Sequence, residues 1–150
     1  MIQTTRRTTL KQLAAAGIAM PYVARTSWAQ AKPSETLRHA SFGGGGMAMA
    51  DLTTISTAKG VTVTAVAEID ERRRNGLKGR FPKAKLYADW REMLDKEAKN
   101  IDCVNVSTPD HLHAAMAMSS MQLGKHVYGQ KPLTHDIYEC RQVQDYAREN

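Results

Sequence analysis

From about residue 36 onward, the apolar positions of the chain follow two alternating periods. Short runs dominated by apolar and β-branched residues, such as "VTVTAVA" at 61–67, are typical of buried strands. The segments between such runs place apolar residues three or four positions apart, as in Trp90–Lys99, which is typical of a helix packed on a sheet. The pattern predicts five strands that alternate with five helices.

The predicted strands are Leu37–Phe42, Val61–Ala67, Lys85–Tyr87, Asp102–Ser107 and Lys125–Tyr128. The predicted helices are Met47–Ala58, Asp70–Lys78, Trp90–Lys99, Asp110–Leu123 and Ile137–Arg148. Strands joined through helices pair in parallel with right-handed crossovers, so helices cover both faces of the sheet. We therefore predict an α/β fold, a doubly wound parallel sheet of the Rossmann type, over residues 37–150. His39 and Ser41 interrupt the apolar first strand, so the site is expected to be weakly held on the side of this strand.

The first 31 residues have the composition of an export signal. A basic start that contains Arg6 and Arg7 is followed by a short Ala-rich apolar stretch, and an A-x-A pattern predicts cleavage after Ala31. The arginine pair resembles the twin-arginine export signal, which predicts a periplasmic protein; an amphipathic first helix is the alternative. The apolar stretch is shorter than the roughly 20 residues that a membrane span needs. Residues 32–36 are expected to form a linker.

The basic charge of the chain is concentrated in that N-terminal segment. It holds four of the 21 Lys and Arg residues and none of the 15 Asp and Glu residues, so the net charge falls from +6 to +2 without it. No basic stripe with interleaved aromatic residues remains, which argues against a nucleic-acid-binding surface. We expect no nucleic-acid partner and no stable membrane span.

The chain has two cysteines, Cys103 and Cys140. The first falls in a predicted strand and the second in a predicted helix, so two buried thiols are expected. A disulfide is the alternative that an oxidising compartment would allow.

Four consecutive glycines stand between the first predicted strand and the first predicted helix. The six residues that begin with the first of them fit G-x-G-x-x-[GA], the dinucleotide fingerprint. Gly43 would make the tight turn, Gly45 would let a pyrophosphate lie against bare backbone, and Ala48 would keep the helix close to the strand. Gly46 and Met47 would offer N–H groups at the helix start. A flexible turn without a ligand is the alternative.

An acidic residue follows at the place where a dinucleotide site needs one. Glu68 closes the second predicted strand, 25 positions after Gly43, and would bind the hydroxyls of the adenosine ribose. Its charge would repel a 2′-phosphate, so NAD is favoured over NADP as the cofactor. Arg72–Arg74 favour the opposite choice, because a basic run could accept that phosphate; a solvated helix face is their other interpretation. Asp70 is expected to cap the next helix.

Two further turns lie at the carboxyl end of the predicted sheet, where ligands of open α/β folds bind. Thr108 and Pro109 follow the fourth strand and suit the N-cap and N1 positions of the next helix. His111 and His113 stand two positions apart and therefore do not share a helix face, which argues against a metal site. Lys131 follows the fifth strand. It could bind a hydroxyl or move a proton, or it could be a solvated loop lysine.

The segment from Leu37 to the C-terminus resembles the Gfo/Idh/MocA oxidoreductases, a family of sugar and cyclitol dehydrogenases and their relatives. The resemblance rests on the glycine loop and on the stretches "AEID", "VSTPDHLH" and "GKHVYGQKPL". It implies that Lys131, at the lysine of an E-K-P motif, lies beside the nicotinamide and the substrate as the catalytic residue. It also implies that Thr108, Pro109 and His111 lie near the nicotinamide ribose, and that the substrate is a sugar or polyol.

The chain departs from the family pattern in two ways. Gln130 stands where the family has glutamate, which weakens any electrostatic partnership with Lys131. The chain also ends at Asn150, before the second α/β domain that in the family forms the substrate floor and the dimer contact. Oligomers are therefore expected only where that domain is present.

Three functions are compatible with these features. The first is an exported NAD-dependent oxidoreductase, in which a hydride passes between a sugar-like alcohol and the nicotinamide. The second is a relative that uses NAD for transient oxidation during glycoside cleavage. The third is a nucleotide-binding module without turnover, which the missing second domain favours for these 150 residues. A methyltransferase-like Rossmann domain fits less well, since its nucleoside has no pyrophosphate for the glycine loop to hold.

Overall fold

The computed structural model describes residues 36–150, so the predicted export signal and nearly all of the predicted linker lie outside the described residues. The strands are β1 (Leu37–Phe42), β2 (Val61–Ala67), β3 (Lys85–Tyr87), β4 (Cys103–Val106) and β5 (His126–Gly129). The helices are α2 (Met47–Ser56), α3 (Glu71–Arg80), α4 (Trp90–Glu97), α5 (His113–Gln122) and α6 (Ile137–Glu149), with 3₁₀ turns η1 (Ala98–Asn100) and η2 (Asp110–Leu112).

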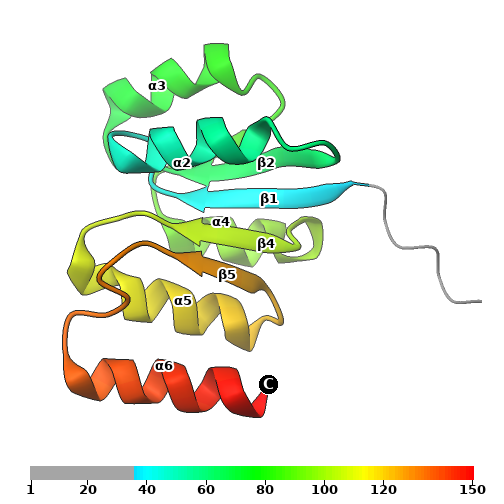
Figure 1. Ribbon diagram of the computed structural model, residues 1–150. Coiled ribbons are helices and arrows are strands. Elements are labelled where there is room, and N and C mark those ends of the chain that lie inside the picture. The colour runs from blue at the N-terminus through cyan, green and yellow to red at the C-terminus, as the bar shows by residue number, and fades with distance from the viewer. Residues whose placement is uncertain (1–35) are drawn as a thin grey trace, which may run out of the picture. The chain divides into compact units, whose positions relative to one another are not determined.

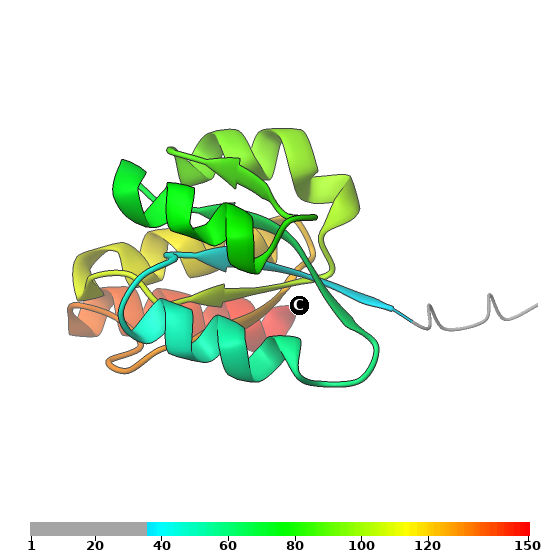
Figure 2. The same cartoon turned by 90° about the horizontal axis from the view of Figure 1, so that it is seen from above.

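The five strands form one parallel sheet in the order β3-β2-β1-β4-β5. The chain runs outward from β1 to β3, crosses back to β4 beside β1, and continues outward to β5. Helices cover both faces, with α2 on one side of the sheet and α4 on the other (Figure 2). The predicted doubly wound, Rossmann-type sheet is therefore confirmed, and its strand order reverses next to β1, where such folds bind ligands.

Each face of the sheet has its own apolar core. On one face, Leu52 of α2 and Leu77 of α3 are fully buried against Val66 of β2. On the other face, Met93 of α4 and Met116 of α5 pack in a larger cluster with buried residues of β1, β2 and β4. Val127 of β5 is partly buried and packs against this cluster. The sheet is held from both sides, which is what a near-continuous apolar sequence in its strands predicts.

The expectation that β1 is weakly held is wrong. His39 and Ser41 are 2% and 0% exposed and lie on the face of β1 opposite the apolar side chain of Phe42. Ser41 Oγ donates to the carbonyl of Gly43 at 2.7 Å, and His39 bonds through both ring nitrogens to β4. No buried side-chain N or O atom within residues 36–150 lacks a hydrogen-bond partner. Hydrogen bonds thus take the place of apolar packing on this face of β1, and the buried polar side chains are satisfied.

Aspartate side chains cap three of the helices. Asp70 caps α3 as predicted, and Asp89 and Asp136 likewise accept hydrogen bonds from backbone N–H groups in the first turns of α4 and α6. By contrast, the helix predicted over Asp110–Leu123 begins as the 3₁₀ turn η2 without a side-chain cap. The Thr108 hydroxyl instead donates to Sδ of Met116 at 3.4 Å, so the predicted N-cap is wrong.

Both cysteines are free, as predicted, but their surroundings differ. Cys103 is partly buried, and burial raises the pKa of its thiol. Cys140 is exposed, which contradicts its predicted burial, because α6 packs mainly beside α5 and buries only Val143 (Figure 1). Within residues 36–150, no helix is both long and apolar enough for a membrane crossing.

Candidate functional site

The candidate site lies at the carboxyl edge of the sheet. Figure 1 shows the arrowheads of β1, β4 and β5 pointing to one side, where the glycine loop and the turns after β4 and β5 come together. The glycine loop spans Gly43–Gly46 and leads directly into α2. This edge is where the topology of an open α/β sheet leaves room for a ligand.

The first and fourth glycines have backbone conformations that other residues rarely adopt. Gly43 has φ +100°, and a Cβ there would lie 2.8 Å from the carbonyl oxygen of Ser107 and 2.9 Å from Cβ of Ala48. Gly46 has φ +53° and stands at the N-cap of α2. Ala48 is 1% exposed. The tight turn at Gly43 and the close approach of α2 through Ala48 are thus confirmed.

Glu68 is bound to the glycine loop itself. Its Oε2 accepts from the backbone N–H of Gly44 at 2.8 Å, its Oε1 accepts from the N–H of Asp70 at 2.9 Å, and it is 7% exposed. The carboxylate therefore fixes the loop and the start of α3 to each other. Each oxygen retains a second lone pair that could accept from a ribose hydroxyl.

The basic run at the start of α3 is more than a solvated helix face. Arg74 bonds back to the carbonyls of Glu68 and Ile69, at 2.8 and 3.3 Å. Arg73 reaches over the glycine loop, since a Cβ on Gly45 would lie 2.5 Å from its Cδ and 2.9 Å from its Nε. An exposed guanidinium thus lies beside the backbone at which a pyrophosphate would be held.

A partly buried acid on α2 is a further polar residue at this edge that the sequence did not single out. Asp51 accepts from Ser107 Oγ at 2.7 Å and from Nε2 of Gln130, which is 3.1 Å from Oδ1 and 3.0 Å from Oδ2. It joins the first helix to the turns after β4 and β5. The helical spacing of Ala48, Asp51 and Leu52, which places all three on the sheet side, was the available signal.

His113, considered in the sequence only as a metal ligand, joins the same two turns. It is 2% exposed, with Nδ1 2.6 Å from the carbonyl oxygen of Pro132 and Nε2 2.7 Å from that of Thr108. The turn that carries Lys131 is thereby held against the turn that carries Pro109. Among the described residues, no group of three or more His, Cys, Asp or Glu side chains could hold a metal ion.

The remaining predicted residues lie on the outside of this edge. Met47, Pro109, His111 and Lys131 are exposed, and Thr108 is partly buried. The Lys131 side chain has no hydrogen bond or ion pair within the described part of the chain, while its backbone N–H donates to Oε1 of Gln130 at 3.3 Å. The structure therefore brings Lys131, Thr108 and the glycine loop to one edge of the sheet and leaves the ammonium free.

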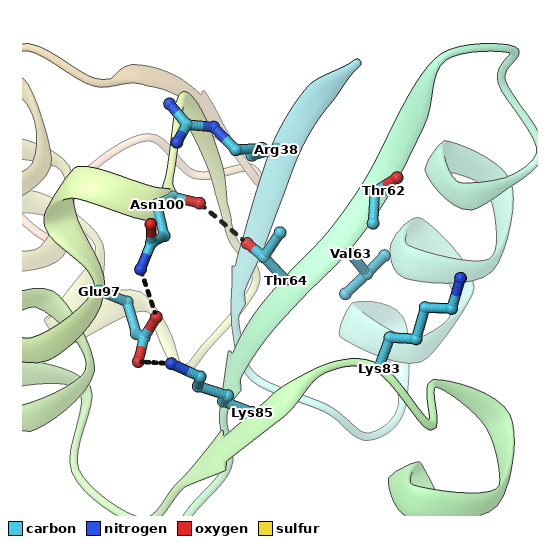
Figure 3. Close-up of a pocket in the computed structure, with 8 residues that line it drawn as sticks. All are labelled: Arg38, Thr62, Val63, Thr64, Lys83, Lys85, Glu97 and Asn100. Atoms are coloured by element: carbon cyan, nitrogen blue, oxygen red, sulfur yellow. Dashed lines mark hydrogen bonds and ion pairs between the residues drawn. The ribbon is translucent and has the colours of Figure 1, made fainter.

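A hollow lies at the opposite edge of the sheet, and hydrogen bonds within the protein account for the buried acid beside it. The hollow is lined by residues at the amino ends of β1, β2 and β3 and by Glu97 of α4 (Figure 3). Glu97 is 3% exposed and accepts from Lys85 Nζ, Tyr87 Oη and Asn100 Nδ2. Burial alone would raise the pKa of this carboxyl, but the three donors outweigh it and lower the pKa. The donors satisfy the carboxylate without any ligand.

Comparison with known families gives a match over the whole described fold. The family GFO_IDH_MocA, described as "Oxidoreductase family, NAD-binding Rossmann fold", matches residues 37–150. The match begins at the first residue of β1 and runs through the last helix. It includes the glycine loop, Glu68 and both turns described above.

Individual proteins are similar at moderate identity. An alpha-N-acetylgalactosaminidase of Shewanella oneidensis is 34% identical over 93 residues, which are 59% of this chain and 20% of that protein. The crystal structure of GenD2 from gentamicin A biosynthesis in complex with NAD has a TM-score of 0.69 at 28% identity, over 76% of this chain and 32% of that one. A Synechocystis biliverdin reductase with biliverdin and NADP⁺ shares the fold at 23% identity and a TM-score of 0.69, over 75% of this chain and 35% of that one. The matched part of this chain thus spans only a fifth to about a third of these proteins.

Proposed function

Because the chain belongs to the Gfo/Idh/MocA oxidoreductase family, we propose that residues 37–150 bind NAD within an exported oxidoreductase that acts on a sugar or polyol. The glycine loop carries the proposal. At Gly43 a side chain would collide with the carbonyl of Ser107, directly after β4, whereas at Gly45 the nearest atoms belong to the side chain of Arg73. The loop is therefore both rigidly turned and open to a ligand, which is what a pyrophosphate against bare backbone requires.

The residues that would hold the cofactor come from three elements. Gly45, Gly46 and Met47 present backbone N–H groups at the start of α2, where the helix dipole favours phosphate. Glu68, already fixed by two backbone N–H groups, would accept from the ribose hydroxyls. Thr108, Pro109 and His111 would line the nicotinamide end, since the turn after β4 is at the same edge.

Lys131 is the proposed catalytic residue. When bound, the nicotinamide supplies the hydride chemistry, and the protein must orient the substrate and manage its hydroxyl proton. Within residues 36–150 the Lys131 ammonium makes no hydrogen bond or ion pair, so it can donate to a substrate hydroxyl. His113 contacts the backbone of its turn at Pro132, and Asp51 holds the Gln130 side chain, which in turn accepts from the Lys131 N–H; both contacts restrict where the ammonium can reach.

The choice of NAD over NADP rests on Glu68. An ionised carboxylate with 7% exposure at the ribose would repel a 2′-phosphate. The Arg73 side chain lies closest to the open side of Gly45 and would favour such a phosphate. We propose that Glu68 dominates because it is fixed by hydrogen bonds, whereas the side chain of Arg73 is 60% exposed and makes one long ion pair, of 3.9 Å, with Asp70.

Calorimetric titration of the 150-residue chain tests the cofactor assignment. NAD is expected to bind more tightly than NADP, and Glu68→Gln is expected to narrow that difference. Equal affinity for both cofactors in the unaltered chain would refute the preference, and absence of binding to either would refute the site. Because Lys131 alone would have to orient a sugar and complete a proton relay, the chain by itself is expected to form no NADH with polyols.

A second candidate is net glycoside cleavage through transient oxidation by tightly held NAD. The similarity to an alpha-N-acetylgalactosaminidase favours it. Release of nitrophenol from a nitrophenyl N-acetylgalactosaminide without accumulation of NADH, measured on a protein that includes a substrate domain, would support this function. Steady-state NADH production from a polyol would support the dehydrogenase instead.

A further inference from the structure

The polar layer on one face of β1 and β4 has a single direction of hydrogen bonding that ends at Asp51. An ionised carboxylate only accepts, so the Ser107 hydroxyl must donate to Asp51, at 2.7 Å. Ser107 Oγ can then accept from Asn105 Nδ2 at 2.9 Å. This leaves Asn105 Oδ1 facing His39 Nε2 at 2.8 Å, so Nε2 must carry the proton.

The same assignment of donors and acceptors extends to the far end of the layer, at His39 and Cys103. With Nε2 protonated and the ring neutral, Nδ1 of His39 accepts from the thiol of Cys103, 3.1 Å away. Burial lowers the pKa of His39 and raises that of Cys103, which keeps the ring neutral and the thiol protonated. Every donor therefore points toward Asp51, and the buried Asn105 and His39 have one orientation each.

Gln130 meets the same carboxylate from the other side. Its Nε2 is about equally distant from both oxygens of Asp51, at 3.1 and 3.0 Å. Its Oε1 accepts from the backbone N–H of Lys131 at 3.3 Å. The Gln130 amide thus donates to Asp51 of α2 and accepts from the N–H of Lys131 in the turn. An ionised glutamate at this position could only accept.

We propose that Asp51 is a positioning residue for the Lys131 turn, and that Gln130 is required at its position because Asp51 faces it. This inference rests on the proposed function, in which Lys131 lies at the nicotinamide end of the cofactor. A glutamate at 130, the residue expected there from the family pattern, would bring two carboxylates together and push the turn away from α2. An Asn at 51 has one acceptor atom, so its NH₂ group would face either Ser107 or Gln130, both of which already donate.

A reciprocal exchange tests the proposal. Asp51→Asn and Gln130→Glu each break the carboxylate–amide pair, whereas the double variant Asp51→Asn/Gln130→Glu restores one carboxylate and one amide with their places exchanged. Asp95→Asn and Gln144→Glu make the same chemical changes at exposed positions on α4 and α6 and serve as controls.

The readout compares the Kd of NAD with that of ADP-ribose, which lacks the nicotinamide. Gln130→Glu is expected to raise the Kd of NAD about tenfold, within the usual range for coupled contacts, and to leave that of ADP-ribose within about twofold. The double variant is expected to recover most of the lost NAD affinity, and the controls to match the unaltered chain. A merely structural role would lower the affinities for NAD and ADP-ribose together.

The outcomes separate this inference from the proposed function. If the unaltered chain binds NAD and all variants bind it equally, or if the double variant is no better than Gln130→Glu, Asp51 does not position the turn. If the unaltered chain binds neither NAD nor ADP-ribose, the proposed function fails, and thermal unfolding of the variants then tests the Asp51–Gln130 contact by itself. Rescue of the melting temperature in the double variant would support the Asp51–Gln130 contact, and no rescue would overturn it.

Discussion

Replacing Glu68 with glutamine removes one charge and one acceptor at the centre of the candidate site while preserving the size of the side chain. In the structure, each carboxylate oxygen holds one backbone N–H, that of Gly44 at 2.8 Å and that of Asp70 at 2.9 Å. The side-chain amide has only one acceptor atom. Whichever way it turns, its NH₂ group faces an N–H donor, and one of the two backbone groups loses its partner.

The size of the effect follows from burial. Glu68 is 7% exposed and Gly44 is buried, so solvent does not replace the bond to Gly44 when that bond is the one lost. A hydrogen bond to a charged group contributes about 1.5–3 kcal/mol, and the loss should lower the free energy of unfolding by about that amount. At about 4 °C per kcal/mol for a domain of this size, the melting temperature should fall by about 6–12 °C.

Scanning calorimetry and NAD titration together check this reasoning. Glu71→Gln is the matched control, because Glu71 lies three residues away on the exposed first turn of α3 and should change stability by less than about 0.5 kcal/mol. Glu68→Ala is expected to weaken NAD binding by about 1.5–3 kcal/mol, part of it through loss of loop order. A Glu68→Gln variant as stable as the control would refute the role of the carboxylate as the anchor of the glycine loop.

Three further predictions concern the loop, the pH dependence and the N-terminus. Gly43→Ala should lower the free energy of unfolding by about 1–3 kcal/mol, because the φ of Gly43 is +100° and the new Cβ meets backbone. Gly45→Val should displace the Arg73 side chain and abolish NAD binding. Calorimetry would contradict both predictions if Gly45→Val lost more stability and Gly43→Ala lost more NAD affinity. The hydrogen bond from Arg38 lowers the pKa of Asp102 to about 2, below its unfolded value of 3.8. The ionised carboxylate therefore stabilises the fold at pH values above 3.8, and this stabilisation should be lost as the pH falls toward 2. Asp102→Asn should make the free energy of urea unfolding less dependent on pH over that window. Arg6→Lys with Arg7→Lys should leave the protein in the cytoplasm by cell fractionation, and normal export would point to another pathway.

The sequence alone determined the order and type of the elements in the described part of the chain. The β-branched runs and the helical spacing of apolar residues report local geometry and burial, and both are properties of short segments. The cap at Asp70 was equally local, since its side chain bonds N–H groups two and three residues away. The glycine run was readable because a positive φ, as at Gly43, is tolerated by few other residues.

The tertiary structure decided every contact between residues far apart in the chain. The contact of Asp51 with Gln130 joins positions 79 residues apart, and that of His39 with Asn105 joins positions 66 apart. His39 looked like a defect of the first strand because its partners come from β4, which only the strand order places beside it. A polar residue in a core is stabilised or destabilised by its neighbours in space, and a single sequence does not specify those neighbours until the sheet has been assembled.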